Sequence, residues 1–412
     1  MAPASATPDP YAALTLSPAE LRGAVVTTTT DVKAMDGRVQ RATVTTVYDT
    51  SGHVVSQSRV ITDAAGTVTE RSDRHSEYDA RGQLIDTVST FDSDGDGPGP
   101  TSTAVDTPNY DRQGHLTSEQ QTVDDNGDGV IDRTNTFAFG NDRRGRALTT
   151  TYDYSNSNES GSGYVLTTTY DQRGNVLEWD TVQHDEHGAV LLHDVVKLAY
   201  DSRGQLIRQT QSQAQGPGAL TLMQDEQQTY DPRGQLTLLN ARIDDDGDGV
   251  YDRQIDVRND YGQAGRLLRS VTTSTDPASG RTTNLEAVTY GYDNRGRQVS
   301  TLAEFDTDGD GVPEATQRLI SKYDSQGRLE HTTGDTHDAD GQLVDNQFYA
   351  YTYDTKGRIS LESWTDTASG STTTATTRYD YIGRSTVTYT SDVDYGDDGV
   401  IDDSVTVTRT LS

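Results

Sequence analysis

Five acidic loops contain the residues of this chain that are best suited to chemistry. They read DSDGDGPGP from Asp92, DDNGDGVID from Asp124, DDDGDGVYD from Asp244, DTDGDGVPE from Asp306 and DYGDDGVID from Asp394. Alternate acids on a tight loop can direct several carboxylates to one point. Calcium takes six to eight oxygen ligands at about 2.3–2.6 Å. The loops therefore predict several bound calcium ions, which would hold the loops in place.

The expected ligands come from the first, third and fifth loop positions, from the backbone carbonyl at the seventh and from an acid at the ninth. Two loops depart from this pattern, because the first has no acid at its ninth position and the last has Gly396 at its third. The loops are similar to the hairpin calcium loops of integrin-type FG-GAP repeats, in which a ninth-position acid completes the site. The predicted metal ligands are Asp92, Asp94, Asp96, Asp124, Asn126, Asp128, Val130, Asp132, Asp244, Asp246, Asp248, Val250, Asp252, Asp306, Asp308, Asp310, Val312, Glu314, Asp394, Asp398, Val400 and Asp402.

A second motif recurs about every 30 residues along the chain. It reads YDARGQL at Tyr78 and YDPRGQL at Tyr230, and weaker copies begin at Asn141 and Tyr261. The spacing of Asp and Gly predicts a type I turn followed by a left-handed glycine, a common hairpin loop. The remaining copies begin at Tyr48, Tyr110, Tyr170, Tyr200, Tyr292, Tyr323, Tyr353 and Tyr379.

A further turn lies midway between successive tyrosine turns, so each unit has two strands of roughly ten residues. We expect a leader with one short helix over residues 1–23, and a hairpin-repeat domain of about twelve units over residues 24–412. The predicted fold is all-β, a repetitive antiparallel meander that forms a curled or spiral sheet. The alternative is a β-propeller of about six blades, each built from two units.

The composition limits the class of function. Hydrophobic residues make up 31% of the chain, and the formal charge is −31. Such acidity argues against nucleic acid as a partner, because phosphate binding needs basic side chains. There is no cysteine, and the sequence has no apolar run long enough for a membrane helix. We therefore expect no membrane span, and the first residues lack the pattern of a signal peptide.

The tyrosine turns resemble the YD repeats of RHS proteins and of related toxin-complex shells, over roughly residues 40–390. The resemblance implies a bacterial protein whose hairpins form a long, curling sheet. It also implies an extracellular or cell-surface location, or a place in a toxin-delivery shell.

These patterns lead to a hypothesis of a calcium-stabilised structural, adhesive or self-assembling surface module without catalysis. Its expected partners are calcium, other copies joined through free edge strands, or a surface protein or glycan. Two alternatives remain open: a ligand- or protein-binding propeller and a fragment of a toxin-delivery shell. An enzymatic reading would need a pair of carboxylates on a tyrosine-lined sheet, and the sequence singles out no such pair.

Overall fold

The computed structural model describes residues 21–33, 39–93, 102–156, 162–368, 370–383 and 385–411. Within these ranges the regular structure is entirely β. Most strands are nine to eleven residues long and rich in Thr and Val, which fit a pleated surface. The strands are β1 Val25–Lys33, β2 Val39–Tyr48, β3 Val54–Thr62, β4 Val68–Tyr78, β5 Leu84–Asp92, β6 Ser102–Tyr110, β7 Leu116–Asp124, β8 Arg133–Asn141, β9 Ala147–Asn156, β10 Ser162–Tyr170, β11 Val176–His184, β12 Val190–Tyr200, β13 Leu206–Gln215, β14 Thr221–Tyr230, β15 Leu236–Ile243, β16 Arg253–Tyr261, β17 Leu267–Asp276, β18 Arg281–Tyr292, β19 Gln298–Asp306, β20 Ala315–Tyr323, β21 Leu329–Asp338, β22 Leu343–Tyr353, β23 Ile359–Ala368, β24 Ser371–Ile382, β25 Thr386–Tyr395 and β26 Asp403–Leu411.

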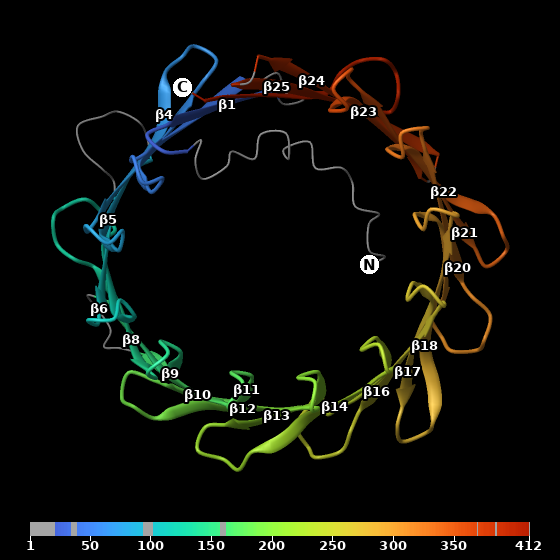
Figure 1. Ribbon diagram of the computed structural model, residues 1–412, viewed down its shortest axis with the longest axis horizontal. Helices are drawn as coiled ribbons and strands as arrows, with labels where there is room; N and C mark the ends of the chain where they lie inside the picture. The colour runs from blue at the N-terminus through green and yellow to red at the C-terminus, as the bar shows by residue number, and fades with distance from the viewer. Residues whose placement is uncertain are drawn as a thin grey trace.

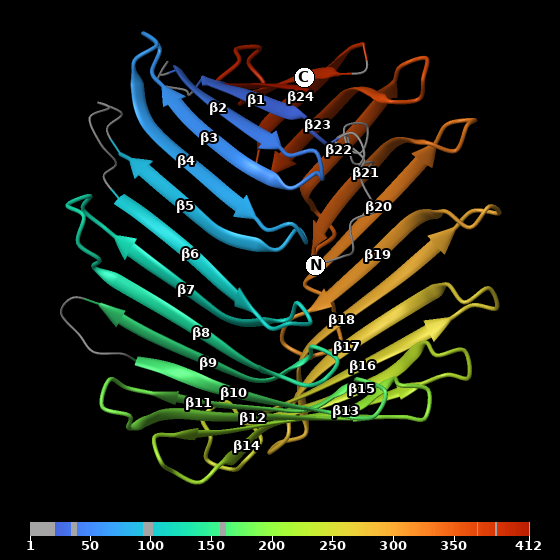
Figure 2. The same cartoon turned by 60° about the vertical axis from the view of Figure 1, so that its left-hand side comes forward.

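The strands form one antiparallel sheet that closes on itself. Each strand pairs with the next along the chain, and β1 also pairs with β26, from Val26 opposite Leu411 to Lys33 opposite Ser404. The result is a 26-stranded barrel, which appears as a ring when viewed along its short axis (Figure 1). The strands are strongly tilted, as closure of a barrel requires (Figure 2).

The closed barrel corrects the predicted fold class. The sheet is neither an open curl or spiral nor a propeller, because β1 and β26 share eight paired positions and the sheet is not divided into blades. Self-assembly through free edge strands is wrong for the same reason, since the two strands expected to form those edges pair with each other.

The barrel wall is one sheet thick and polar on both faces. Its buried apolar residues form small local clusters, such as Leu329, Tyr351, Ile359 and Tyr379 on neighbouring strands. Strand β4 illustrates the polarity, because five of its eleven residues, Glu70 to Arg74, are Glu, Arg, Ser, Asp and Arg. The low hydrophobic content of the chain therefore corresponds to a wall without a thick core.

The hairpin loops divide between two rims. The tyrosine turns follow even-numbered strands and form one rim, here called the tyrosine rim. The midway turns and the acidic loops follow odd-numbered strands and form the acidic rim. The loop between β19 and β20 lies at the outer margin in Figure 2, whereas the turn between β4 and β5 lies nearer the centre. The acidic rim is thus the wider of the two.

In the described part of the chain, no helix is long and apolar enough to cross a bilayer. The earlier expectation of no membrane span rested on the lack of an apolar run, and this argument is wrong for the observed fold. A closed β-barrel satisfies all of its backbone hydrogen bonds between strands, so it needs no such run to span a membrane.

Candidate metal centres

The loop between β19 and β20 shows how the sequence builds an acidic site. Asp306 is 3% exposed, and its two carboxylate oxygens accept hydrogen bonds from the N–H groups of Gly309 at 2.6 Å and Gly311 at 2.8 Å. Asp308 and Asp310 each accept a hydrogen bond from the N–H two residues further on, at 3.0 and 2.8 Å. This network folds the loop around its own carboxylates.

Glycine is required at the fourth position of this loop. Gly309 has φ of +74°, in the left-handed region. A Cβ atom there would lie 2.0 Å from the carbonyl oxygen of Thr282 on the neighbouring hairpin. A side chain at this position would therefore both strain the backbone and displace the adjacent loop.

Two loops bring several predicted carboxylate ligands together, although Asp248 is not among them. Carboxylate oxygens of Asp306, Asp308, Asp310 and Glu314 lie within 4.8 Å of one another. Those of Asp244, Asp246 and Asp252 meet the same limit. Two unit charges 4 Å apart repel by about 1 kcal/mol in water and about 4 kcal/mol in a partly buried setting. A divalent cation would convert this repulsion into attraction, and oxygen-only ligands favour calcium over softer metals.

The loop between β7 and β8 has the same backbone network around Asp124. Burial alone would raise the pKa of Asp124, but hydrogen bonds from the N–H groups of Gly129 and Gly127 outweigh it and hold the pKa below its usual value. Asn126 occupies the third position, so this loop has one carboxylate fewer than its counterpart after β15. Asp132 closes the loop through the N–H of Asp125 at 2.8 Å.

The acid at the second position of these loops has another role. The Arg253 side chain donates to both oxygens of Asp245, at 2.6 and 2.7 Å, and these bonds lower the pKa of Asp245. Arg133 contacts Asp125 in the same way, at 2.7 and 2.5 Å. The second acid is therefore neutralised by the arginine that follows the loop, which leaves the alternate acids for a cation.

The first and last acidic loops are less complete. In the last loop Gly396 replaces the third-position ligand, yet Asp397 adopts φ of 53° where the other loops have glycine. Asp394 is 4% exposed and accepts the N–H of Gly399 at 2.8 Å, so the loop keeps its backbone form with fewer ligands. In the first loop Asp92 is buried, whereas Asp94 and Asp96 lie outside the described residues.

The tyrosine rim has contacts that the sequence analysis did not anticipate. Each turn aspartate accepts hydrogen bonds from its own turn, as Asp354 does from the N–H groups of Lys356 and Arg358. Arg358 also donates its Nε–H to Asp354 at 2.8 Å and lies 3.8 Å from the ring centroid of Tyr381 on the next hairpin. The Tyr381 hydroxyl donates back to the carbonyl of Ile359 at 3.0 Å.

The same contacts recur around the rim and join successive hairpins. Arg146, Arg297 and Arg328 each bind their own turn aspartate and lie over the tyrosine of the next hairpin. The sequence signal is the residue after the turn glycine, which is Arg, Gln, His or Asn in most copies. The last copy is shifted, because Tyr381 rather than Tyr379 takes the tyrosine position.

A pair of carboxyl groups on β22 and β23 was also missed. The Nε2–H of Gln347 donates to Asp345 at 3.1 Å, and Asp366 lies on the neighbouring strand. One oxygen of each carboxyl is buried without a hydrogen-bond partner, and so is the indole nitrogen of Trp364. The two acids are 21 residues apart, and only the strand register shows that they are neighbours. One oxygen of each carboxyl is inaccessible, so we assign this pair to the wall and not to a reaction.

Comparison with known proteins gives little independent evidence for a family or a function. No protein-family profile matches the chain, and no curated protein matches it. Among solved structures, it is similar to a porin-like protein from Bacteroides vulgatus, with 11% identity and a TM-score of 0.25 over 53% of this chain and 92% of the other. A porin-like protein from Bacteroides uniformis gives 10% and 0.22, over 68% of this chain and 96% of the other. The P pilus usher (PapC) translocation pore gives 8% and 0.31, over 94% and 98%.

These TM-scores are too low to carry an argument about fold or function, so the barrel rests on the strand pairing of this chain alone. The predicted kinship with YD-repeat RHS proteins is wrong, because no family profile matches and the sheet closes where that resemblance implied an open curl.

The functional hypothesis built on that kinship is corrected with it. A surface module that assembles or adheres through its sheet edges needs free edges, and the pairing of β1 with β26 removes them. The toxin-shell and propeller alternatives are wrong for the same reason. The extracellular or cell-surface location rested on the resemblance and on the exclusion of a membrane span. The closed antiparallel barrel overturns it, because this architecture is the one that β-proteins use to span outer membranes.

Proposed function

We propose that this chain is a non-catalytic, pore-type barrel whose lumen is a water-filled passage, with calcium bound in the loops of its acidic rim. The observation that carries the proposal is the pairing of β1 with β26, which closes 26 strands around a lumen. Barrels of about eight strands are filled by their own side chains, whereas those of 16 or more enclose a channel unless it is plugged.

The shape of the barrel also fits a passage. Its strands have 8 to 12 residues, close to the 9–11 that a tilted membrane strand needs. Short turns at one rim and longer loops at the other are typical of outer-membrane pores. The polar wall suits hydrated solutes, because a lumen lined by polar side chains has no dry constriction that they would have to cross.

Charged side chains lie on both faces of the wall, so the experiment must distinguish a wall in lipid from a wall in water. Lys197 and Glu178 are 3.4 Å apart on one face, and Arg59 pairs with Glu70 on the other. A lipid-facing charge at mid-membrane costs about 2–4 kcal/mol in such barrels. Cross-strand pairing reduces this cost, and so does coverage of the wall by another protein.

These charges favour a second candidate, a barrel that surrounds an extended polymer in water. The two candidates share the lumen and differ in the surroundings of the outer wall. A lipid-based experiment therefore separates them.

The test uses vesicles that contain a self-quenching polar dye, incubated with the purified chain in millimolar calcium. The passage proposal predicts dye release with a size cut-off. The matched control ends at residue 402, which removes β26 and leaves β1 and β25 each with one unpaired edge. Release by the full chain alone would support a pore. Closed rings in electron micrographs together with intact vesicles would reject a lipid pore and favour the polymer-enclosing barrel.

Calcium is tested separately by titration calorimetry. We expect the loops after β15 and β19 to bind first, because both bring their carboxylates together. Absence of calcium binding would reject the metal sites and leave the passage proposal intact.

A further inference from the structure

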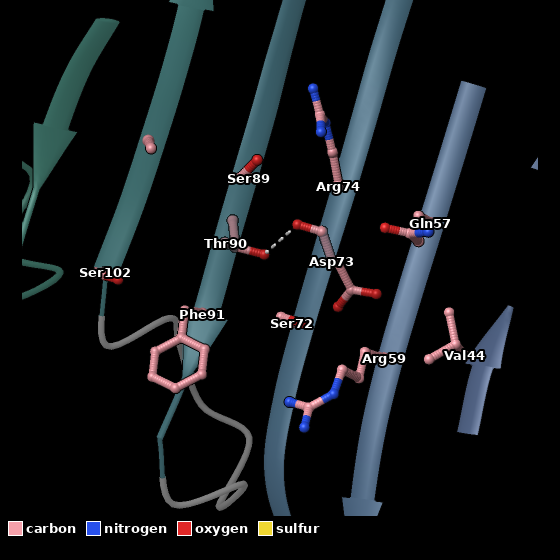
Figure 3. A pocket seen from close by; sticks show the side chains of 11 residues that line it. Val44, Gln57, Arg59, Ser72, Asp73, Arg74, Ser89, Thr90, Phe91 and Ser102 are labelled. Atoms are coloured by element: carbon pink, nitrogen blue, oxygen red, sulfur yellow. Dashed lines mark hydrogen bonds between the residues drawn. The ribbon is translucent and has the colours of Figure 1, made fainter. Parts of the chain in front are cut away.

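A hollow of about 550 Å³ lies on the barrel wall across strands β2 to β6, within the range of small-molecule sites (Figure 3). Two adjacent rows of side chains form it. The first row runs through Arg59, Ser72 and Phe91, which are paired positions on β3, β4 and β5. The second runs through Gln57, Arg74 and Ser89 on the same three strands.

Small side chains between larger ones create the hollow. Ser72 lies between Arg59 and Phe91 in the first row (Figure 3). Neighbouring strands are about 4.8 Å apart, so the backbones that carry Arg59 and Phe91 are about 10 Å apart. Ser89 lies beside Arg74 in the other row. An open floor of serine hydroxyls is therefore bounded by two arginines and one aromatic ring.

The two arginines differ in their partners. Arg59 forms an ion pair with Glu70, which fixes its guanidinium. Arg74 is exposed, and within the described residues no hydrogen bond or ion pair satisfies its guanidinium. Asp73 also lines the hollow, although alternation along β4 directs its side chain to the face opposite Arg74. In a chain with a charge of −31, an unpaired guanidinium in a hollow is a site for an anion.

Phe91 supplies the apolar part of the site. It lies at the end of β5 and is 38% exposed. Exposed phenylalanine at the edge of a polar hollow offers a flat face for an aromatic ring, and such pairs contribute about 0.5–1.5 kcal/mol beyond area burial. The serine hydroxyls can exchange hydrogen bonds with a ring hydroxyl.

We propose that this hollow binds a hydroxylated aromatic carboxylate. Arg74 would take the carboxylate, Phe91 would stack on the ring, and Ser72 or Ser89 would bond the ring hydroxyl. Arg59, held by Glu70, would form the opposite wall. This inference concerns binding alone and does not depend on passage through the lumen.

The test is a titration of the full chain with 4-hydroxybenzoate, in which binding is measured by calorimetry and by saturation-transfer NMR. We expect Arg74→Gln to weaken affinity more than tenfold, because a charge-assisted hydrogen bond is lost. Phe91→Leu, which keeps an apolar side chain, should weaken it about fivefold. The matched control is Arg318→Gln, an exposed arginine on β20 that should leave affinity unchanged.

The methyl ester of the probe is the second control, because it keeps the ring and loses the charge. Binding of the ester equal to that of the acid would overturn the role of Arg74. The same affinity in the wild type and in both hollow variants would overturn the site, as would no saturation transfer to the probe at millimolar concentration. Circular dichroism of each variant separates loss of binding from loss of folding.

Discussion

The two rims of the barrel are built from the same hairpins and are stabilised in different ways. On the tyrosine rim each turn aspartate has donors from its own turn, and in several turns an arginine joins it to the next tyrosine. On the acidic rim, carboxylate oxygens in the loops after β15 and β19 lie within 4.8 Å of one another. The tyrosine rim is held by contacts within the chain, whereas the acidic rim has clustered carboxylates whose repulsion a bound cation would relieve. A wall only one sheet thick can therefore be stabilised by contacts at its two rims.

Removal of calcium should change the two rims differently, and this is the largest effect that we expect. A chelator should speed amide hydrogen exchange in the loops at residues 244–252 and 306–314 by at least tenfold, and leave the turn at residues 230–236 unchanged. Each site saturated at 100 times its dissociation constant contributes about 2.7 kcal/mol, so two sites give about 5 kcal/mol. The melting temperature should fall by several degrees. Equal changes at both rims, or none, would contradict the contrast.

The acidic loops and the tyrosine turns were both predictable, because each is a local motif. The Asp-x-x-Gly spacing specifies a turn, and the structure has the Asp79 N–H bonded to Gln83 and Tyr78 paired with Leu84, as the sequence predicts. Local spacing also places Asp306, Asp308, Asp310 and Glu314 on one loop, where their carboxylate oxygens converge, whereas in the loop at Asp244 the predicted ligand Asp248 is not among the converging acids.

Closure of the sheet was not predictable from such motifs. The β1–β26 contact joins Val and Thr positions such as Thr29 and Thr408, which resemble every other pair in the wall. It depends on the twist accumulated over 26 strands, and no single residue encodes it. The Asp345–Asp366 pair and the hollow at Arg74 escaped prediction because they require the register between strands.

Acid should weaken the tyrosine rim. Hydrogen bonds from the Arg146 backbone and side chain lower the pKa of Asp142 from 3.8 to about 2, and those from His53 lower the pKa of Asp49 likewise. Because the folded-state pKa is depressed, this stabilisation is complete above the unfolded value and is lost as pH falls from about 4 towards 2. The melting temperature should drop in this window. NMR titration of Asp142 with a midpoint near its ordinary value would contradict the prediction.

Two aspartate substitutions compare an acidic loop whose ligands converge with one that lacks a ligand. Asp310→Ala removes an exposed fifth-position ligand from the loop whose four acids converge and should eliminate one calcium ion, at a cost of about 2–3 kcal/mol in saturating calcium. Asp398→Ala removes the equivalent acid from the loop that already lacks its third ligand, and should change the stoichiometry little. Calorimetric titration measures both. A loss of one ion in each variant would mean that Gly396 does not weaken the last site.

Arg358→Ala tests the links between hairpins on the tyrosine rim. It removes the ion pair to Asp354 and the contact with Tyr381, both of which are partly buried. We expect a loss of about 1–2 kcal/mol in urea unfolding, whether calcium is present or not. Arg318→Ala, an exposed arginine of the wall, is the control and should stay within about 0.5 kcal/mol of the wild type. A larger loss in chelator than in calcium would show that the rims are coupled.

The smallest effect that we expect comes from removal of one hydrogen bond on the tyrosine rim. The Tyr353 hydroxyl donates to the carbonyl of Leu329 at 2.7 Å, and Tyr353→Phe removes that donor while keeping the ring under Arg328. Loss of one such bond costs about 1 kcal/mol. Tyr164→Phe is the matched control, because the Tyr164 hydroxyl has no hydrogen bond within the described residues and its ring is tilted against that of Tyr152 at 5.4 Å. If both variants unfold at the same urea concentration, the rim is held by its rings and ion pairs. If only Tyr353→Phe is weakened, the hydroxyl ladder contributes to joining successive hairpins.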